Sequence, residues 1–215
     1  EGKALENLLN RQIDGLLCCI EPEEDSSAYR LLKNASIPIV FVNRQEPGFS
    51  SVSTSLKPAL LESMRRFAEH GCRKVYGSFY RKSLWPQNFL DSSRAYGFEP
   101  ANIPEELDEA GIREHLRSVQ NGERHCYVFN GYRMQTLMMR CFSEYPDYHP
   151  DVVVGVDDYS LQEESQYIIG GIYTDSPSLI RFSVNHLIRL LENRGSPKQE
   201  HILLKNNPWF GRCSR

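Results

Sequence analysis

The sequence predicts an α/β fold in which parallel sheets carry helices on both faces. Two observations lead to this prediction. Short continuous apolar runs, the pattern of strands buried on both faces, recur along the chain. Segments with helical periodicity separate these runs, so that strand and helix alternate, as they do in parallel sheets. With 215 residues, the chain can hold one large domain or two small ones.

The first part of the chain contains two predicted helix–strand pairs. Ala4–Gln12 has leucines at helical spacing, and the apolar run Gly15–Ile20 after it is predicted to be a buried strand. Ser26–Asn34 is predicted to be a helix, with a serine at its start to cap the first turn. "IPIVFVN", Ile37–Asn43, is predicted to be the second buried strand. The stretch "QEPGFSS" that follows is predicted to be a loop or linker.

The middle of the chain continues the alternation. Apolar residues at helical spacing predict a helix over Lys57–His70, and Gly71 is expected to end it in the left-handed conformation. Lys74–Phe79 is predicted to be a strand and Trp85–Tyr96 a helix. Trp85 can belong to the core or stack on a sugar ring. The stretch "ANIPEELDEAG" is polar and turn-rich, and we expect it to be irregular.

The same criteria give the remaining elements, while residues 159–171 show no clear periodicity and are expected to be irregular. The last predicted helix has a proline in its first turn, where the missing N–H costs nothing. The predicted helices are Ile112–Val119, Met134–Tyr145 and Pro177–Asn193, and the predicted strands are His125–Asn130, Asp151–Asp157 and His201–Lys205.

Composition argues against several classes of function. The net charge is -3 and the basic clusters are short, so no nucleic-acid surface is expected within these residues. No apolar run approaches the roughly 18 residues of a membrane span, and no signal peptide is recognisable. The six cysteines form no C-x-x-C motif, so we expect reduced thiols, no metal, no cofactor and a cytoplasmic protein. The chain opens without methionine, in helical periodicity, which suggests a fragment.

Polar side chains follow several predicted strands. Asn43, Asn130 and Asp157 end their strands, and Arg81 follows another after a short turn. Open parallel sheets bind ligands beyond the carboxyl ends of their strands. Amides, a carboxylate and a guanidinium there suit a polar, polyhydroxylated small molecule. Each residue also has a backbone reason to stand at a strand end, since asparagine and aspartate favour turns. Asp158 is expected to cap or to face solvent.

No catalytic motif is found. The sequence lacks G-x-G-x-x-G, a P-loop, G-x-S-x-G and H-E-x-x-H, and its histidines show no ligand spacing. We therefore expect no catalytic residue and no enzyme. One alternative is a metal-dependent enzyme in which Asp157 and Asp158 hold Mg²⁺. It would also need a lysine and a hydroxyl at neighbouring strand ends, and none can be placed.

Several motifs, in order, resemble those of one family. "LLNRQIDGLL" resembles a helix followed by a "vDGii" strand, and "IPIVFVNR" resembles "iPvVliDr". "RKSLW", "CYVFNGYRMQTL" and "DVVVGVDDYS" resemble "R..Gw", "aifa.NDxmAlg" and "disVvGfDd". Together they resemble the effector-binding domain of the LacI/GalR transcriptional regulators, which is related to periplasmic sugar-binding proteins. Asn43, Ser55 and Gly131 stand where that family has acids, and Cys72 where it has histidine.

The resemblance implies two Rossmann-like parallel-sheet subdomains joined by three crossovers, the periplasmic-binding-protein-like type I fold. The first strand, helix and strand of the amino-terminal subdomain are missing from this sequence. The amino-terminal subdomain would comprise 1–55 and 177–204, and the carboxyl-terminal one 56–176 and 205–215. A small effector, expected to be a sugar or sugar derivative, would bind in the cleft between them. The matching ligand contacts are Asn43, Arg81, Asn130 and Asp157, with Asp175 a weaker candidate.

The resemblance also implies partners. A homodimer would pass effector binding to DNA-binding domains that lie outside these residues, with no membrane involved. The alternative within the same fold is a solute-binding protein of a sugar transport system. What precedes Glu1 distinguishes the two, because a transport protein needs a signal peptide and a regulator needs a DNA-binding domain.

Overall fold

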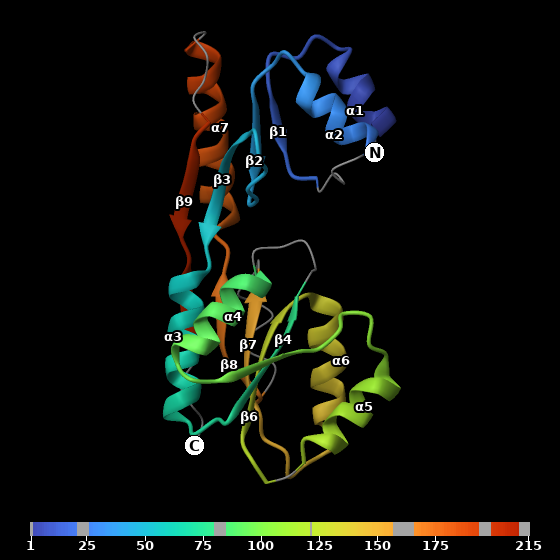
Figure 1. Cartoon of the computed structure of the whole chain (residues 1–215), viewed down its shortest axis with the longest axis vertical. Helices are drawn as coiled ribbons and strands as arrows, with labels where there is room; N and C mark the ends of the chain where they lie inside the picture. The colour runs from blue at the N-terminus through green and yellow to red at the C-terminus, as the bar shows by residue number, and fades with distance from the viewer. Residues whose placement is uncertain are drawn as a thin grey trace. The chain divides into compact units, whose positions relative to one another are not determined.

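The chain forms two compact units, each with its own sheet (Figure 1). The computed structural model describes residues 2–20, 26–79, 85–120, 122–156, 166–193 and 199–210. The chain crosses between the units three times, after Thr54, Thr174 and Leu204. Unit 1 comprises Glu1–Thr54 and Asp175–Leu204, and unit 2 comprises Ser55–Thr174 and Lys205–Arg215. The predicted α/β fold with parallel-sheet subdomains and three crossovers is confirmed.

Unit 1 contains a four-stranded sheet in the order β1-β2-β3-β9, in which β1 pairs parallel with β2 and β2 with β3. Side chains of β2 alternate between the two faces. Phe41 packs with α1 and α2, whereas Val40 packs with α7 on the other face. Both faces are therefore buried, which explains the continuous apolar run of β2. The strands are β1 (Leu16–Cys18), β2 (Ile39–Val42), β3 (Ser50–Ser55) and β9 (His201–Lys205), and the helices α1 (Gly2–Leu9), α2 (Ser27–Asn34) and α7 (Ser176–Glu192).

Unit 2 contains a six-stranded sheet in the order β10-β8-β7-β6-β4-β5. All of its strands run parallel except β10, which is antiparallel to β8. The strands are β4 (Lys74–Phe79), β5 (Glu99–Asn102), β6 (His125–Asn130), β7 (Asp151–Val156), β8 (Ile168–Tyr173) and β10 (Asn207–Phe210). The helices are α3 (Lys57–Glu69), α4 (Trp85–Ala95), α5 (Glu109–Ser118) and α6 (Tyr132–Phe142). Helices α3 and α4 pack on one face of this sheet, and α5 and α6 on the other.

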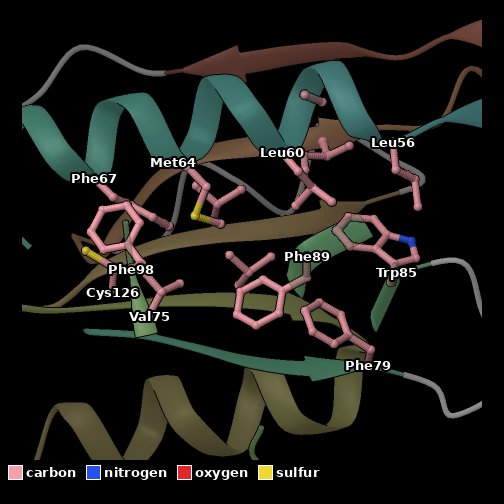
Figure 2. Packing of buried hydrophobic residues seen from close by; sticks show 14 of the residues in the cluster. Leu56, Leu60, Met64, Phe67, Val75, Phe79, Trp85, Phe89, Phe98 and Cys126 are labelled. Atoms are coloured by element: carbon pink, nitrogen blue, oxygen red, sulfur yellow. The ribbon is translucent and has the colours of Figure 1, made fainter. Parts of the chain in front are cut away.

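Helix α3 presents one apolar face to the unit 2 sheet. Leu60, Met64 and Phe67 recur at helical spacing and are fully buried. Figure 2 shows them pointing from α3 towards Val75 of β4 and the rings of α4. The helix ends before Gly71, whose φ of +75° confirms the predicted left-handed terminator.

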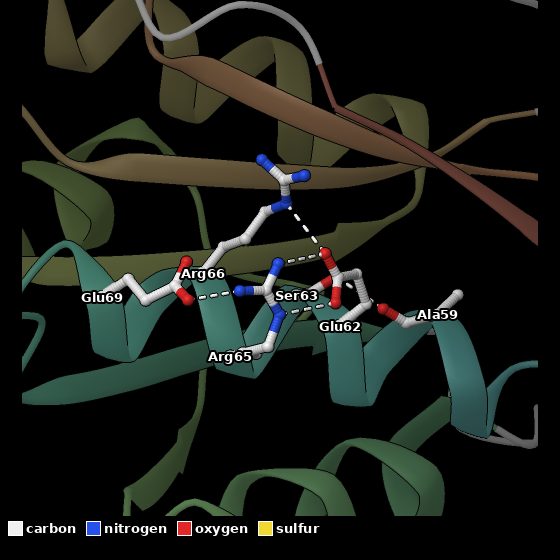
Figure 3. A network of polar contacts seen from close by, with 6 residues as sticks. All are labelled: Ala59, Glu62, Ser63, Arg65, Arg66 and Glu69. Atoms are coloured by element: carbon white, nitrogen blue, oxygen red, sulfur yellow. Dashed lines mark hydrogen bonds and ion pairs between the residues drawn. The ribbon is translucent and has the colours of Figure 1, made fainter.

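The outer face of α3 carries a network of ion pairs (Figure 3). Arg65 contacts Glu62 at 2.6 Å and also pairs with Glu69 one turn later. Arg66 donates a further hydrogen bond to Glu62 at 3.1 Å. The hydrogen bond from Arg65 is the main cause that lowers the pKa of Glu62. Because water screens these exposed ion pairs, each stabilises the protein only slightly. Their spacing of three and four residues favours the helical conformation of α3.

Four strands were not predicted from the sequence. β3 is a run of buried serines, and part of it was assigned to a loop. β8 lies partly within the stretch expected to be irregular, and β5 overlaps the start of the turn-rich stretch. β5 and β10 both contain a proline, and both are edge strands, where one missing backbone donor is tolerated. Pairing with neighbouring strands, rather than local propensity, defines these four elements.

The cysteines differ from the expectation that all are reduced. Cys72 and Cys126 form a disulfide, while Cys18, Cys19 and Cys141 are free. Parallel pairing of β4 and β6 sets Val75 opposite Cys126 and brings the Cα atoms of the two cysteines to 6.2 Å. That separation lies within the usual disulfide range. The two cysteines are 54 residues apart in the sequence, so the sequence alone does not indicate that they are close in space.

Among the described residues, no helix is long and apolar enough to cross a bilayer. The longest described helix, α7, has 17 residues and alternates apolar with charged and polar side chains.

Acidification should destabilise unit 2 through a partly buried imidazole. Burial lowers the pKa of His115 from 6.5 to about 4, and the charges of His125 and Lys74 add smaller effects in the same direction. The unfolded state therefore binds more protons between these two values. Stability is complete above about pH 6.5 and falls as the pH drops towards about 4. The expected loss is on the order of 1–2 kcal/mol, discounted for the part of the ring that solvent reaches.

Urea unfolding of the wild type and of His115→Gln, at neutral and at mildly acidic pH, measures this effect. The ring of His115 meets the edge of Tyr76 and its Nε2 lies 3.3 Å from the hydroxyl of Tyr127. Glutamine is a polar replacement that does not titrate. The variant should lose less stability on acidification than the wild type, and an equal loss in both would show that His115 is not responsible.

Candidate functional site

The carboxyl ends of the parallel strands of unit 2 lie at one edge of the sheet. Phe79, the last residue of β4, pairs with Asn130, the last residue of β6. Val156, which ends β7, pairs with Tyr173, which ends β8. Ligands bind at such edges in open parallel sheets. The register therefore brings together the ends of the strands that precede the predicted site residues.

Asn130 is the predicted site residue that the structure describes in unit 2. Its side chain is half-buried, and no hydrogen-bond partner for its amide is found among the described residues. Its Oδ1 lies 3.1 Å from where a Cβ on Gly155 would be. The amide thus sits against β7, and an amide can both donate and accept hydrogen bonds.

Gly155 makes room for two side chains of this edge. A Cβ at Gly155 would meet the indole of Trp85 at 2.7 Å as well as the amide of Asn130. Trp85 is buried and stacks on Phe79, with 5.9 Å between ring centroids and 23° between planes. Of the two readings of Trp85 from sequence, the structure supports the core position, next to the candidate site.

Asn43 occupies the corresponding edge of unit 1, directly after β2. Its φ of +57° is left-handed, a conformation that asparagine adopts more readily than most residues. Its N–H donates to the carbonyl of Val52 at 2.7 Å, and its Oδ1 accepts from Thr54 Oγ1 at 3.0 Å. Asn43 therefore joins β2 and β3 near their carboxyl ends, and its side chain is exposed; a contact with a ligand remains a prediction.

Two further polar residues near Asn43 escaped sequence reasoning. Thr54 is the next-to-last residue of the serine-rich strand β3, whose polar composition gave no sign of a buried strand. Glu46 is 5% exposed and accepts from Arg44 Nε at 2.8 Å. A single acid in a loop is normally read as a solvated side chain, so no sequence signal could have shown that Glu46 is buried.

Asp175 has a defined structural role. It is the N-cap of α7, where its Oδ1 accepts from the backbone N–H of Ser178 at 3.0 Å. Hydrogen bonding to Ser178 lowers the pKa of its carboxyl group. This capping role is enough to explain why residue 175 is an aspartate. A contact between Asp175 and a ligand remains a prediction.

Arg81 and Asp157 lie outside the described residues, as does Asp158. In the sequence, Arg81 follows the last residue of β4 by two positions and Asp157 directly follows β7. Both strands end at the edge that carries Asn130.

Comparison by sequence gives no relationship: no protein-family profile and no curated protein sequence matches the chain. Comparison by structure finds similar proteins. The transcription regulator CcpA of Lactococcus lactis superposes with a TM-score of 0.78 and 15% identity, over 99% of this chain and 82% of that one. The trehalose repressor from Escherichia coli gives 0.73 and 15%, over 97% and 82%.

A third similar structure carries a ligand in its name. It is a periplasmic binding protein/LacI transcriptional regulator from Alkaliphilus metalliredigens complexed with D-xylulofuranose, with a TM-score of 0.72 and 16% identity, over 97% of this chain and 80% of that one. At these identities the similarity establishes the fold. It is the fold of periplasmic-binding-protein-like, LacI-type regulator domains, as the sequence motifs predicted.

Proposed function

We propose that this chain, built on the fold of LacI-type effector domains, is the ligand-sensing part of a transcriptional regulator. It binds a small polar effector, a sugar or sugar derivative, in the cleft between its two units. Binding controls the attachment to DNA of a domain outside these residues. The similar structure from Alkaliphilus metalliredigens supports the ligand class, since it is described as complexed with D-xylulofuranose.

The observation that carries this proposal is the position of Asn130. A half-buried amide with no partner among the described residues lies at the strand edge where such sheets bind ligands. Leaving a polar group partly buried and unpaired costs stability, and a ligand hydroxyl removes that cost. An amide both donates and accepts, which matches a sugar hydroxyl.

The proposed contacts give each side chain a separate task. Asp157 would accept hydrogen bonds from two hydroxyls of the sugar, and Arg81 would donate a planar pair. Asn43 and Asn130 would bind from the two units, and Asp175 is a weaker fifth candidate. Binding through hydrogen bonds alone requires no catalytic group, and we propose that the chain is not an enzyme.

Signal transmission follows from contacts made by both units. A sugar that bonds to Asn43 in unit 1 and Asn130 in unit 2 favours the arrangement in which both bonds form. The shift can be no larger than the difference in affinity of the sugar for the two arrangements. In a homodimer, which we also propose, this rearrangement would change the spacing of the attached DNA-binding domains.

One observation favours the alternative, a solute-binding protein of a sugar transport system. Cys72 and Cys126 form a disulfide, and disulfides persist in oxidising compartments, where transport proteins work. The segment encoded before Glu1 separates the two functions. A helix-turn-helix or other DNA-binding domain there supports the regulator, and a signal peptide supports the transport protein.

A thermal-shift screen against sugars, sugar phosphates and nucleobases tests the proposal. An effector at about 100 times its Kd should add about 2.7 kcal/mol, which raises Tm by a few degrees. Asn130→Ala and Asp157→Ala should abolish the shift. Asn34→Ala, at the exposed end of α2, is the matched control and should keep it. A sugar that shifts all three variants equally would place its site elsewhere.

A further inference from the structure

A second cluster of functional side chains lies at the opposite edge of the unit 2 sheet. Cys72 lies two residues before the start of β4, Cys126 is the second residue of β6, and Asp151 begins β7. The two Sγ atoms and a carboxylate oxygen of Asp151 all lie within 4.8 Å of one another. All three residues are buried. Three neighbouring elements thus converge on one point at the amino-terminal edge of the sheet.

Asp151 is the centre of this cluster. Its Oδ2 lies 2.8 Å from His70 Nδ1 and 3.8 Å from Cys72 Sγ. Its Oδ1 accepts from Arg124 Nη2 at 2.9 Å. Asp151 is 4% exposed, whereas the side chain of His70 is 24% exposed. The imidazole therefore connects the buried group with solvent.

We propose that reduction of the Cys72–Cys126 disulfide converts this cluster into a zinc site. Cys72, Cys126 and Asp151 would supply two sulfurs and one oxygen, and His70 the fourth ligand. This set of thiolate, imidazole and carboxylate ligands is one that zinc prefers. The site is separate from the proposed effector site, at the other end of the same strands.

The two distances from Asp151 Oδ2 to neighbouring ligand atoms can be compared with tetrahedral zinc, whereas His70 lies outside the group of three whose ligand atoms are all within 4.8 Å of one another and must turn towards both sulfurs. Ligand atoms about 2.0–2.3 Å from the metal stand roughly 3.3–3.8 Å apart at the corners of a tetrahedron. The separation of 3.8 Å between Cys72 and Asp151 fits this range, and that of 2.8 Å between Asp151 and His70 needs a small increase. The two sulfurs must move apart once their bond is broken. Side-chain rotation can supply that movement with the Cα atoms 6.2 Å apart.

The charges also balance. Two thiolates and the carboxylate of Asp151 bring three negative charges, and the zinc ion brings two positive ones. Arg124, already hydrogen-bonded to Asp151, offsets the remaining charge. A buried site needs this neutrality, because uncompensated charge in the interior is costly. A hydrogen bond to a ligating carboxylate is the usual support around a metal.

Occupancy would depend on redox state through two balanced steps. A dithiol reductant passes two electrons and two protons to the disulfide, becomes a disulfide itself, and leaves two thiols on Cys72 and Cys126. Zinc then displaces the two thiol protons as it binds both sulfurs. The same sulfurs cannot be bonded to each other and to the metal, so oxidation expels the ion.

Metal analysis of the wild-type chain in both redox states tests the proposal without any mutation. The chain, reduced with a phosphine and passed through a desalting column after exposure to Zn²⁺, should retain one zinc ion. The same chain left oxidised should retain none. Co²⁺ in place of zinc should give the absorption of tetrahedral cobalt–thiolate coordination. A reduced, folded chain that retains no zinc would overturn the proposal.

Variants locate the ion. Cys126→Ser and Asp151→Asn should each lower zinc retention at least about tenfold, in line with the loss of a ligand. Cys19→Ser, which removes an exposed thiol outside the cluster, should retain as much zinc as the wild type. Zinc that is lost from Cys19→Ser and kept by Cys126→Ser would assign the binding to surface thiols and refute the proposed site.

Discussion

Replacing Phe67 with alanine should lower the free energy of unfolding by about 3–5 kcal/mol. Phe67 is fully buried and lies on the apolar face of α3, within the cluster that joins α3 and α4 to the unit 2 sheet. Removing its ring loses the transfer free energy of the buried carbon atoms and leaves a cavity that the surrounding structure can only partly close. Urea unfolding at neutral pH measures the loss.

Tyr132→Ala is the matched control. Tyr132 is also aromatic and belongs to unit 2, but its side chain is 66% exposed. Its replacement should change stability by less than about 0.5 kcal/mol, as expected for an exposed position. Equal losses for the two variants, or a loss below about 1 kcal/mol for Phe67→Ala, would contradict the packing of α3 described above.

Gly155→Ala should weaken effector binding at least about tenfold, which corresponds to about 1.4 kcal/mol. The new methyl group would lie 2.7 Å from the indole of Trp85 and 3.1 Å from Oδ1 of Asn130. The first distance is too short for any real contact, so the indole must move, and the second is tight enough that the amide must shift by a few tenths of an ångström. Overpacking should also cost about 1–3 kcal/mol of stability. Titration calorimetry with the sugar found by the screen measures the affinity.

Gly71→Ala separates the effect on binding from the effect on stability. Gly71 has a φ of +75°, so alanine there strains the backbone, at a cost of about 1 kcal/mol. Nothing lies within 4 Å of the position of its Cβ, and it stands at the amino-terminal side of β4, away from the proposed contacts. This variant should bind the effector like the wild type. If Gly155→Ala and the wild type bound the effector with equal affinity, Asn130 would not be one of its contacts.

Strands buried on both faces are the ones that the sequence indicates most clearly, although β9, which is exposed at alternate positions, was also predicted. β2 and β7 are continuous apolar runs because helices cover both sides of their sheets, and composition alone reveals such strands. β3 has the opposite character. Its serines are buried by pairing with β2 and by contact with the segment before β9. There, the backbone N–H of Ser51 donates to the backbone carbonyl of Glu200 at 2.9 Å. Contacts with other parts of unit 1 make β3 a strand, and no pattern in its own sequence indicates those contacts.

The candidate sites differ in the same way. Asn43 and Asn130 were predicted because polar residues that end parallel strands lie at one edge whatever the details of packing. Cys72, Cys126 and Asp151 were not grouped, because their proximity depends on which strands are neighbours and in which register. The order of the strands is a property of the whole sheet. It cannot be inferred from the spacing of these three residues along the chain.

Hydrogen–deuterium exchange with and without the sugar found by the screen tests the central claim most directly. If the effector binds at the strand ends of both units, the sugar should slow exchange in the segments that contain Asn43 and Asn130. Helix α5, which packs on a face of the unit 2 sheet, should exchange at an unchanged rate. Protection in one unit alone, or only in segments remote from the carboxyl ends of the strands, would contradict a site formed by both units.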